Sequence, residues 1–330
     1  MNHRNKILIA YDGSECADGA LYSLKRAGLP VDADALVVSV AESWFPPPPP
    51  SSYEAVELPF ADNAVARDSA TVNLKRNELL RNAEELAANA AKWILASFPR
   101  WDVQIEPLYG SPASELLAKS DDWDPDLIVI GSHGRSAIGR MILGSISHKV
   151  VTEARCSVRI GRQTNNLDSG VKVLIGLDGS DDAAEALRTA SRRAWPKGSE
   201  IRFVAVYDAV TPTAVGLLVP QVVKWVEEEN RETIELARKI VESCEMKFRR
   251  DELLTSHLVT SGDPRRVLVD EANRWGADCI FVGARGLSRI DRLLLGNVSA
   301  AVAARAHCSV EVVRSKERQS TDRAAGKEHR

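Results

Sequence analysis

One stretch of sequence occurs twice in this chain: KILIAYDGS at residues 6–14 and KVLIGLDGS at residues 172–180. In each copy a short apolar run predicts a buried β-strand, and the following Asp-Gly-Ser predicts a turn into a helix. A strand that leads directly into a helix is typical of a parallel α/β sheet. The repeat therefore predicts two copies of one α/β domain in tandem.

Two further blocks repeat in the same order. DLIVIGSHG at residues 126–134 matches DCIFVGARG at residues 278–286, and CSVRI at 156–160 matches CSVEV at 308–312. These copies lie 152 residues apart, whereas the first pair lies 166 residues apart. The first half therefore carries 14 extra residues between its first two blocks.

The extra residues are expected after Val40, where Pro46–Pro50 form an unbroken proline run. Such a run favours a stiff polyproline II segment and excludes a helix or a central strand. Because it follows the second expected strand, it should begin at the ligand-binding rim of the sheet. We expect it to limit access to a ligand there, with a simple spacer or a docking segment for a proline-binding partner as alternatives.

The remaining pattern alternates short β-rich runs with amphipathic stretches. Strands are predicted at residues 7–11, 35–40, 103–108, 127–130 and 157–160, and again at 171–177, 201–206, 254–259, 279–282 and 309–313. Helices are predicted at residues 17–27, 69–97, 112–119 and 145–154, and again at 182–194, 221–248, 264–274 and 297–306. Strands separated by helical crossovers predict a doubly wound, Rossmann-like parallel sheet in each half.

This pattern divides the chain into four parts. We expect a first domain at residues 1–161, a polar, turn-rich linker at 162–170, a second domain at 171–314 and a charged, disordered tail at 315–330.

Composition narrows the classes of function. With 43 Lys and Arg against 46 Asp and Glu, the chain has no global positive field, so we expect no nucleic-acid partner. No apolar run reaches 18 residues, which predicts neither a membrane span nor a secretory signal and favours a cytoplasmic location. The five cysteines are widely spaced without a Cys-x-x-Cys pair, so structural zinc and a disulfide framework are not expected.

The glycine-rich loop of the first half carries the chemistry. Gly131 and Gly134 follow the fourth expected strand and are predicted to bring the backbone close to a ligand. Gly144 should open a helix whose free N–H groups, with the hydroxyls of Ser145 and Ser147, face the same space. Parallel sheets bind ligands at the carboxyl ends of their strands, so the loop predicts an anion site there.

The spacing Gly-x2-Gly-x9-Gly-Ser resembles the signature of ATP-binding universal stress proteins. The resemblance covers nearly the whole chain twice, and it implies that the protein binds ATP, with or without Mg²⁺. In the first half it implies that Asp12 and Val40 flank the adenine, that Ile130 and Gly131 close on the adenosine, and that the phosphates contact Gly134, Gly144, Ser145, Ile146 and Ser147. The matching positions of the second half are Asp178, Val206, Val282, Gly283, Gly286, Gly296, Asn297, Val298 and Ser299.

The second copy departs from the signature at one position. Asn297 replaces the Ser or Thr after the last glycine, which removes a small hydroxyl donor and leaves an amide. Losing one hydrogen bond to a charged phosphate costs about 1.5 to 3 kcal/mol. We therefore expect the first half to bind ATP more tightly.

Other interpretations of these residues remain open. Asp12 and Asp178 would also serve as helix caps, and the loops would also serve as plain connections in a fold without a ligand. Arg135, Arg140, Arg285 and Arg289 would reach phosphates or only solvent. No catalytic residue is assigned, because no nucleophile and orienting group can be paired with His133.

The resulting hypothesis is an ATP-binding regulator of the stress response, and the link to stress comes from the resemblance alone. A slow ATPase and a nucleotide-free interaction module are the alternatives, although the chain has neither a Walker motif nor a kinase signature. Family members typically dimerise through the last strand, so the resemblance also implies that the last strands of the two halves pair within the chain. A homodimer of such tandems is left open.

Overall fold

The computed structural model describes residues 4–42, 64–134, 143–163, 170–210, 219–248, 253–286 and 295–315. The predicted proline segment, most of the predicted linker and the tail beyond Ser315 lie outside the described residues.

The first half contains five strands and four helices among the described residues. The strands are β1 (Asn5–Ala10), β2 (Ala33–Glu42), β3 (Asp102–Gly110), β4 (Leu127–Gly131) and β5 (Ser157–Gly161). The helices are α1 (Glu15–Leu24), α2 (Ala64–Ser97), α3 (Pro112–Trp123) and α4 (Ser145–Glu153).

The described part of the second half repeats this series. Its strands are β6 (Lys172–Leu177), β7 (Glu200–Tyr207), β8 (Leu254–Ser261), β9 (Cys279–Gly283) and β10 (Ser309–Val313). Its helices are α5 (Asp181–Ser191), α6 (Pro220–Phe248), α7 (Pro264–Trp275) and α8 (Asn297–Arg305).

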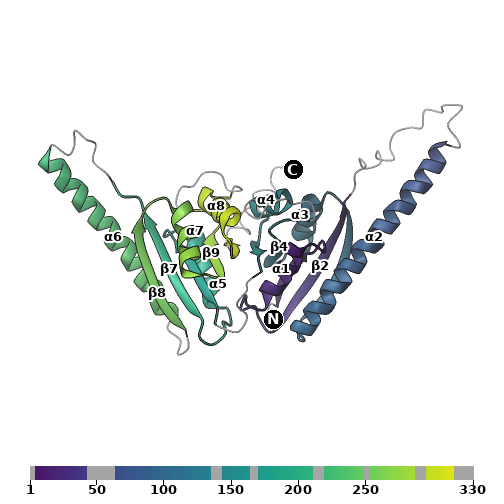
Figure 1. Cartoon of the computed structure of the whole chain (residues 1–330), viewed down its shortest axis with the longest axis horizontal. Helices are drawn as coiled ribbons and strands as arrows, with labels where there is room; N and C mark the ends of the chain where they lie inside the picture. The colour runs from purple at the N-terminus through teal and green to yellow at the C-terminus, as the bar shows by residue number, and fades with distance from the viewer. Residues whose placement is uncertain are drawn as a thin grey trace, which may run out of the picture.

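All these strands form one sheet in the order β3-β2-β1-β4-β5-β10-β9-β6-β7-β8. Neighbours within each half are parallel, and β5 pairs with β10 antiparallel, so the predicted pairing of the last strands within one chain is confirmed. We call the β5–β10 pairing the seam. Figure 1 shows the two halves as lobes on either side of it, with the long helices α2 and α6 at the far ends.

The hydrophobic core lies on both faces of the sheet. On one face, α3, α4, α7 and α8 cover a core that runs through both halves. On the other face, α1 with α2 and α5 with α6 cover two separate cores, one in each half. The α/β fold with doubly wound halves is therefore as predicted, and the two halves share one continuous layer.

The Asp-Gly-Ser repeat forms the same turn twice. Gly13 and Gly179 have φ of 75° and 80°, a left-handed conformation that glycine adopts without strain. Ser14 then caps α1 by accepting a hydrogen bond from the Ala17 N–H at 3.2 Å, as Ser180 does for α5. The predicted start of these helices at residues 17 and 182 was therefore late.

The predicted ends of these two helices were wrong as well, since α1 ends at Leu24 and α5 at Ser191 rather than at Ala27 and Ala194. After each helix the chain turns towards the other half. After α1 the Ala27 N–H bonds locally to the Leu24 carbonyl at 3.0 Å, and after α5 the Ala194 N–H donates to the Gly28 carbonyl of the other half at 2.9 Å. Tight turns and a contact between the halves therefore stand where further helix was predicted.

Two arginines connect the halves reciprocally. Arg314 follows β10 and donates to the Val151 carbonyl at the end of α4 at 2.6 Å. Arg162 follows β5 and donates to the Ala303 carbonyl near the end of α8 at 2.7 Å. A guanidinium at a helix C-terminus satisfies carbonyls that have no partner within the helix and complements the helix dipole. Burial lowers the pKa of Arg314 to about 10, so it remains charged at neutral pH.

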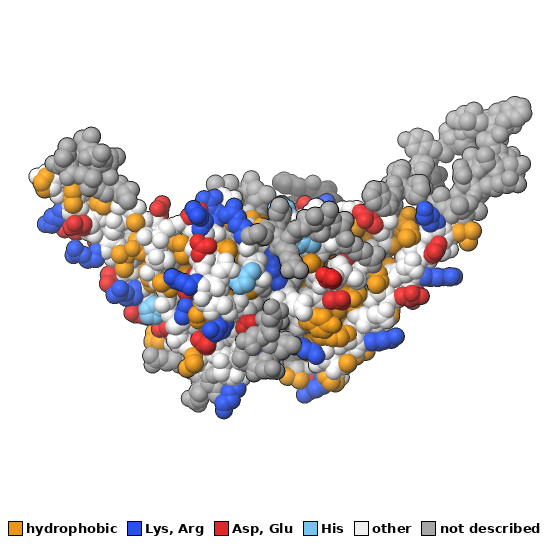
Figure 2. Space-filling model, in the orientation of Figure 1, with side chains coloured by type: hydrophobic (Ala, Val, Ile, Leu, Met, Phe, Trp, Pro, Cys, Tyr) orange, Lys and Arg blue, Asp and Glu red, His pale blue; other side chains and the backbone are white. Residues whose placement is uncertain are grey.

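The surface and the cysteines agree with the composition. Figure 2 shows acidic and basic side chains interspersed over the visible face. Among the described residues no helix has the length and apolar character needed to cross a membrane. The five cysteines are all free thiols, as predicted.

Replacing Arg314 by Met should reduce the free energy of unfolding by about 3 kcal/mol, because the Val151 and Thr152 carbonyls of α4 lose a charged donor. The midpoint of urea unfolding measures this loss. Arg305→Met, at an exposed arginine of α8, is the matched control and should change stability by less than about 0.5 kcal/mol. Equal midpoints for the two variants would show that the reciprocal caps contribute nothing.

Candidate functional site

Each half has a topological switch point between two of its strands. In the first half β1 lies between β2 and β4, and the chain leaves β1 towards β2 but returns on the other side at β4. In the second half β6 lies between β7 and β9 in the same way. Crevices for ligands form outside the carboxyl ends of the strands at such points. The repeated Asp-Gly-Ser turns and glycine loops follow these ends.

Asp12 holds the turn after β1. Its Oδ1 accepts hydrogen bonds from the Ser14 backbone N–H at 3.0 Å and from the Ser14 hydroxyl at 2.6 Å. Asp178 accepts from the Ser180 N–H at 2.9 Å in the same manner. The helix caps are thus the two serines, and the aspartates fix the turn that presents them.

The structure requires a glycine at position 131 for a cause that differs from the predicted one. A Cβ at this position would lie 2.9 Å from the Cys16 carbonyl carbon, within the backbone at the start of α1. At Gly283 a Cβ would lie 2.6 Å from the Ala183 nitrogen of α5. The missing side chain lets the first helix pack on the strand end. The space that a side chain would occupy is therefore filled by helix backbone.

Gly134 faces the carboxylate of Asp12. A Cβ on Gly134 would lie 3.1 Å from Asp12 Oδ2, and a Cβ on Gly286 would lie 2.8 Å from Asp178 Oδ2. The second glycine of each loop thus brings the loop backbone next to the strand-end carboxylate.

The last glycine of each loop begins a helix, as predicted. The Gly144 N–H donates to the Ser132 carbonyl at 2.9 Å, and α4 starts at Ser145. The equivalent bond joins the Gly296 N–H to the Ala284 carbonyl at 2.8 Å before α8. The first N–H groups of a helix have no acceptor within it, so both helices point anion-binding donors at their loop.

The hydroxyls at these helix starts divide into two kinds. Ser147 donates to the Gly131 carbonyl at 2.8 Å and is buried, and Ser299 donates to the Gly283 carbonyl in the same way. These two hydroxyls hold the loop to the start of the helix. The sequence predicted that they would point at a phosphate, but their protons are directed at backbone carbonyls instead. Ser145 and Asn297 are exposed, and at this position the first half has a hydroxyl and the second half an amide.

His133 lies in the first loop. Its Nδ1 lies 3.1 Å from the Ser132 hydroxyl. Burial, together with the nearby charge of Arg162, lowers the pKa of His133 below its usual 6.5. The imidazole is therefore uncharged at neutral pH and adds no cation to the site.

The second half contains a cavity of about 480 Å³ at its switch point. Its lining includes all nine positions expected there: Asp178, Val206, Val282, Gly283, Gly286, Gly296, Asn297, Val298 and Ser299. Ligand pockets commonly measure about 300 to 1,000 Å³, so the cavity has the size of a small-molecule site. The equivalent first-half apolar residues, Val40, Ile130 and Ile146, lie in or against the shared core.

Arg285 is held differently from the prediction. Its Nε lies 2.9 Å from Asp182 Oδ2 on α5, and the Asp182 side chain is 2% exposed. This ion pair ties the second loop to α5. The first half has His133 and Cys16 at the matching positions, with the Cys16 thiol accepting from the Ser132 hydroxyl at 3.7 Å. The other three loop arginines of the prediction lie outside the described residues.

Sequence reasoning missed one wall of the cavity. Pro264 and Leu268 of α7 line it together with Leu295. Pro264 opens α7 immediately after β8 ends at the same edge of the sheet, and this placement was the available signal. No cluster of three or more metal-ligating side chains occurs among the described residues.

Comparison with known proteins agrees with this arrangement. The model of the universal stress protein family matches residues 3–161 and again 171–314. A universal stress protein from Mycolicibacterium smegmatis is 28% identical over 314 residues, covering 93% of this chain and 96% of that protein. A shorter one from Thermus aquaticus is 37% identical over 156 residues, covering 47% of this chain and 97% of its own.

Solved structures share the fold. The crystal structure of a universal stress protein from Archaeoglobus fulgidus superposes with a TM-score of 0.63 at 21% identity, covering 94% of this chain and 99% of that one. A putative universal stress protein from Pseudomonas aeruginosa gives 0.56 at 14% identity, covering 96% of each. With the family pattern present in both halves and the full length matched, this chain belongs to the universal stress protein family as a tandem two-domain member.

Proposed function

We propose that the protein binds ATP at the switch point of each half and acts as a nucleotide-dependent regulator in the stress response. The observation that carries the proposal is the second-half cavity, which is lined by all nine positions expected from the signature and is bounded by the start of α8.

The chemistry of the cavity suits a nucleotide. Val206, Val282 and Leu268 supply apolar walls for a base, while Asn297, Val298 and Ser299 begin α8 and carry N–H groups for phosphate oxygens. A helix N-terminus adds about 0.3 to 1 kcal/mol for an anion when exposed and up to about 2 when partly buried. Hydrogen bonds to charged oxygens add about 1.5 to 3 kcal/mol each.

The first half supports the same use through matching geometry. Asp12, Gly134 and Gly144 have the same mutual contacts as their second-half counterparts, and α4 begins where α8 does. Val40, Ile130 and Gly131 complete the proposed adenosine contacts there. We take Mg²⁺, if it enters, to be held mainly by phosphates and water, because Asp12 and Asp178 each supply one carboxylate already engaged in the turn.

We infer that a bound nucleotide would act on the contact between the halves through α4 and α8. α4 and α8 each begin at one proposed phosphate site and pack against each other across the seam. A phosphate drawn to either helix start therefore acts on an element of the contact between the halves. The nucleotide-bound and nucleotide-free forms of the protein would then differ in their affinity for a partner.

Protein purified without added nucleotide should release intact ATP on denaturation, up to two molecules per chain, as identified by mass spectrometry. The variant Gly134→Val/Gly286→Val should release much less, because each new side chain meets a strand-end carboxylate. ADP in place of ATP would favour the ATPase alternative. Nucleotide-free protein that also ignores added ATP in calorimetry would contradict the proposal.

Exchanging the residues that differ should exchange the affinities. Asn297→Ser should tighten ATP binding in the second half by about tenfold, and Ser145→Asn should weaken the first by a similar factor, because each exchange adds or removes one hydroxyl donor. Calorimetric titration resolves the two phases. Ser147 and Ser299 stay unchanged in both variants, because both halves have this hydroxyl and it cannot account for a difference between them. Unchanged affinities would assign the difference to other residues.

The first site should also show itself in the titration of His133. Without nucleotide, NMR should give His133 a pKa below 6.5, and bound ATP should raise it because phosphate favours the imidazolium. The unfolded chain binds more protons here than the folded chain, so this residue reduces stability as pH falls through 6.5. His133→Asn should accordingly lose less stability than the parent protein between pH 7 and 5. An unshifted pKa with and without ATP would contradict this assignment.

A further inference from the structure

The centre of the seam lies at two equivalent positions of the repeat. In the antiparallel pairing Arg159 of β5 faces Glu311 of β10, flanked by Ile160 with Val310 and by Val158 with Val312. These two residues are 152 residues apart, the offset that relates the last blocks of the two halves. Each of them therefore faces its own counterpart, as residues on a twofold axis do.

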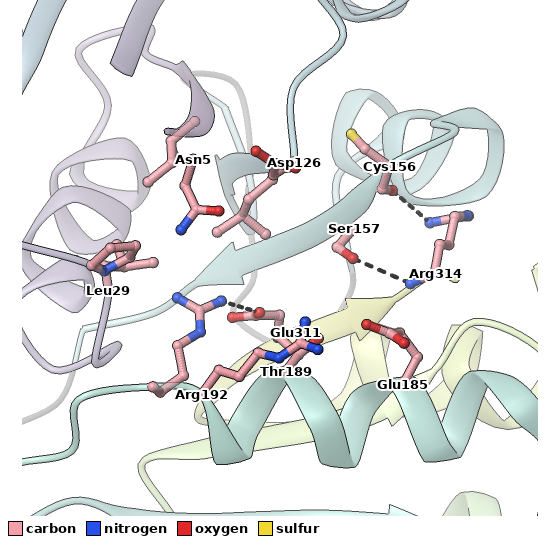
Figure 3. Close-up of a pocket in the computed structure, with 14 residues that line it drawn as sticks. Asn5, Leu29, Asp126, Cys156, Ser157, Glu185, Thr189, Arg192, Glu311 and Arg314 are labelled. Carbon is pink, nitrogen blue, oxygen red and sulfur yellow. Dashed lines mark hydrogen bonds and ion pairs between the residues drawn. The ribbon is translucent and has the colours of Figure 1, made fainter. Parts of the chain in front are cut away.

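The two central residues are buried and oppositely charged. The side chains of Arg159 and Glu311 are 2% and 0% exposed, with Nη1 of the arginine 3.3 Å from Oε2 of the glutamate. Arg193 pairs with the other glutamate oxygen, and Cys279 accepts from Arg159 Nη1 at 3.2 Å. Figure 3 shows Glu311 beside a cavity of about 210 Å³ that both halves line.

Other contacts across the seam occur twice, once from each half. The backbone N–H of Arg314 donates to the Ser157 hydroxyl at 3.2 Å, and the backbone N–H of Arg162 donates to the Ser309 hydroxyl at 3.1 Å. The helix caps by these two arginines are equally reciprocal. Two copies of one half would retain all of these contacts, so they do not determine which half pairs with which.

An ion pair of a further kind is also available to either half. Arg26 pairs with Asp278 of the other half at 3.1 Å. The equivalent residues Arg192 and Asp126 both line the cavity of Figure 3. Each half thus owns one such arginine and one such aspartate, and this contact does not discriminate either.

The central pair does discriminate. If two first halves paired through β5, Arg159 would face a second Arg159 at a buried position, where an uncompensated charge is strongly unfavourable. If two second halves paired through β10, two buried glutamates would meet, although each would bring Arg193 from its own half. Arg159 therefore opposes self-pairing of its half more strongly than Glu311 does.

Sterics act against the pair of second halves. Gly28, with φ of 60°, approaches the other half so closely that a Cβ would lie 2.9 Å from Arg193 Cβ. Its counterpart in the repeat is Ala194, which has that Cβ. A pair of second halves would place the alanine methyl against the arginine stem. Each kind of self-pairing thus meets its own obstacle, one electrostatic and one steric.

We propose that Arg159 restricts β5 to pairing with the Glu311-bearing strand β10, so that the two halves of this chain recognise each other and reject copies of themselves. Specificity of this kind comes from the penalty on the wrong pair, and it does not require the right pair to be especially stable.

The test uses the complete chain, folded and then cut once. A protease site replaces residues 164–169, and the cut protein is mixed with an isotope-labelled batch until labelled and unlabelled halves have exchanged. Native mass spectrometry then counts unlike pairs, which contain one first half and one second half, and self-pairs, which contain two copies of the same half. The variants are Arg159→Gln, which leaves Glu311 with Arg193, and Arg155→Gln, a matched control at an arginine that is 58% exposed in the same half.

The parent protein and the Arg155→Gln control should show self-pairs in less than about 1% of first halves, as expected for a buried unpaired charge. The Arg159→Gln variant should raise that fraction at least about tenfold while keeping its unlike pairs. Abundant first-half self-pairs in the parent protein would overturn the proposal. So would an Arg159→Gln variant that stays as selective as the control.

Discussion

The backbone hydrogen bonds between β5 and β10 satisfy two sheet edges that would each attract another strand if left open. Because these edges close on each other, the chain forms one sheet, and a core on one face of it continues from α3 and α4 to α7 and α8. The helices that begin at the glycine loops belong to this shared layer. The position of each candidate site therefore depends on a contact that neither half makes alone.

Within each half the site is shaped by how closely backbone segments approach one another. Gly131 and Gly283 let the first helix of each half sit against the strand end, and Gly134 and Gly286 bring the loop beside an aspartate. This packing leaves helix N-termini as donors at the loop, so the proposed recognition of an anion would rely mainly on backbone N–H groups. Side chains then adjust the site, and the two halves differ mostly at such side chains.

The repeat made the fold predictable, because two independent copies of each strand-turn-helix block indicate the same element twice. The sequence also predicted that α4 and α8 begin after Gly144 and Gly296. It did not reveal that the Ser147 hydroxyl closes its own loop or that Arg285 pairs with Asp182, since both depend on contacts between segments far apart in the chain. The wall formed by α7 was missed for the same reason, and helix ends were misjudged where the halves touch.

The twist of the sheet works together with the antiparallel seam to place the two candidate sites. β5 and β10 run in opposite directions, but β2 and β7, each second from an end of the sheet, both rise in Figure 1 towards the side where α4 and α8 lie. Ligands at the two switch points would therefore face the same side of the molecule. A single partner surface on that side would be able to contact both halves at once.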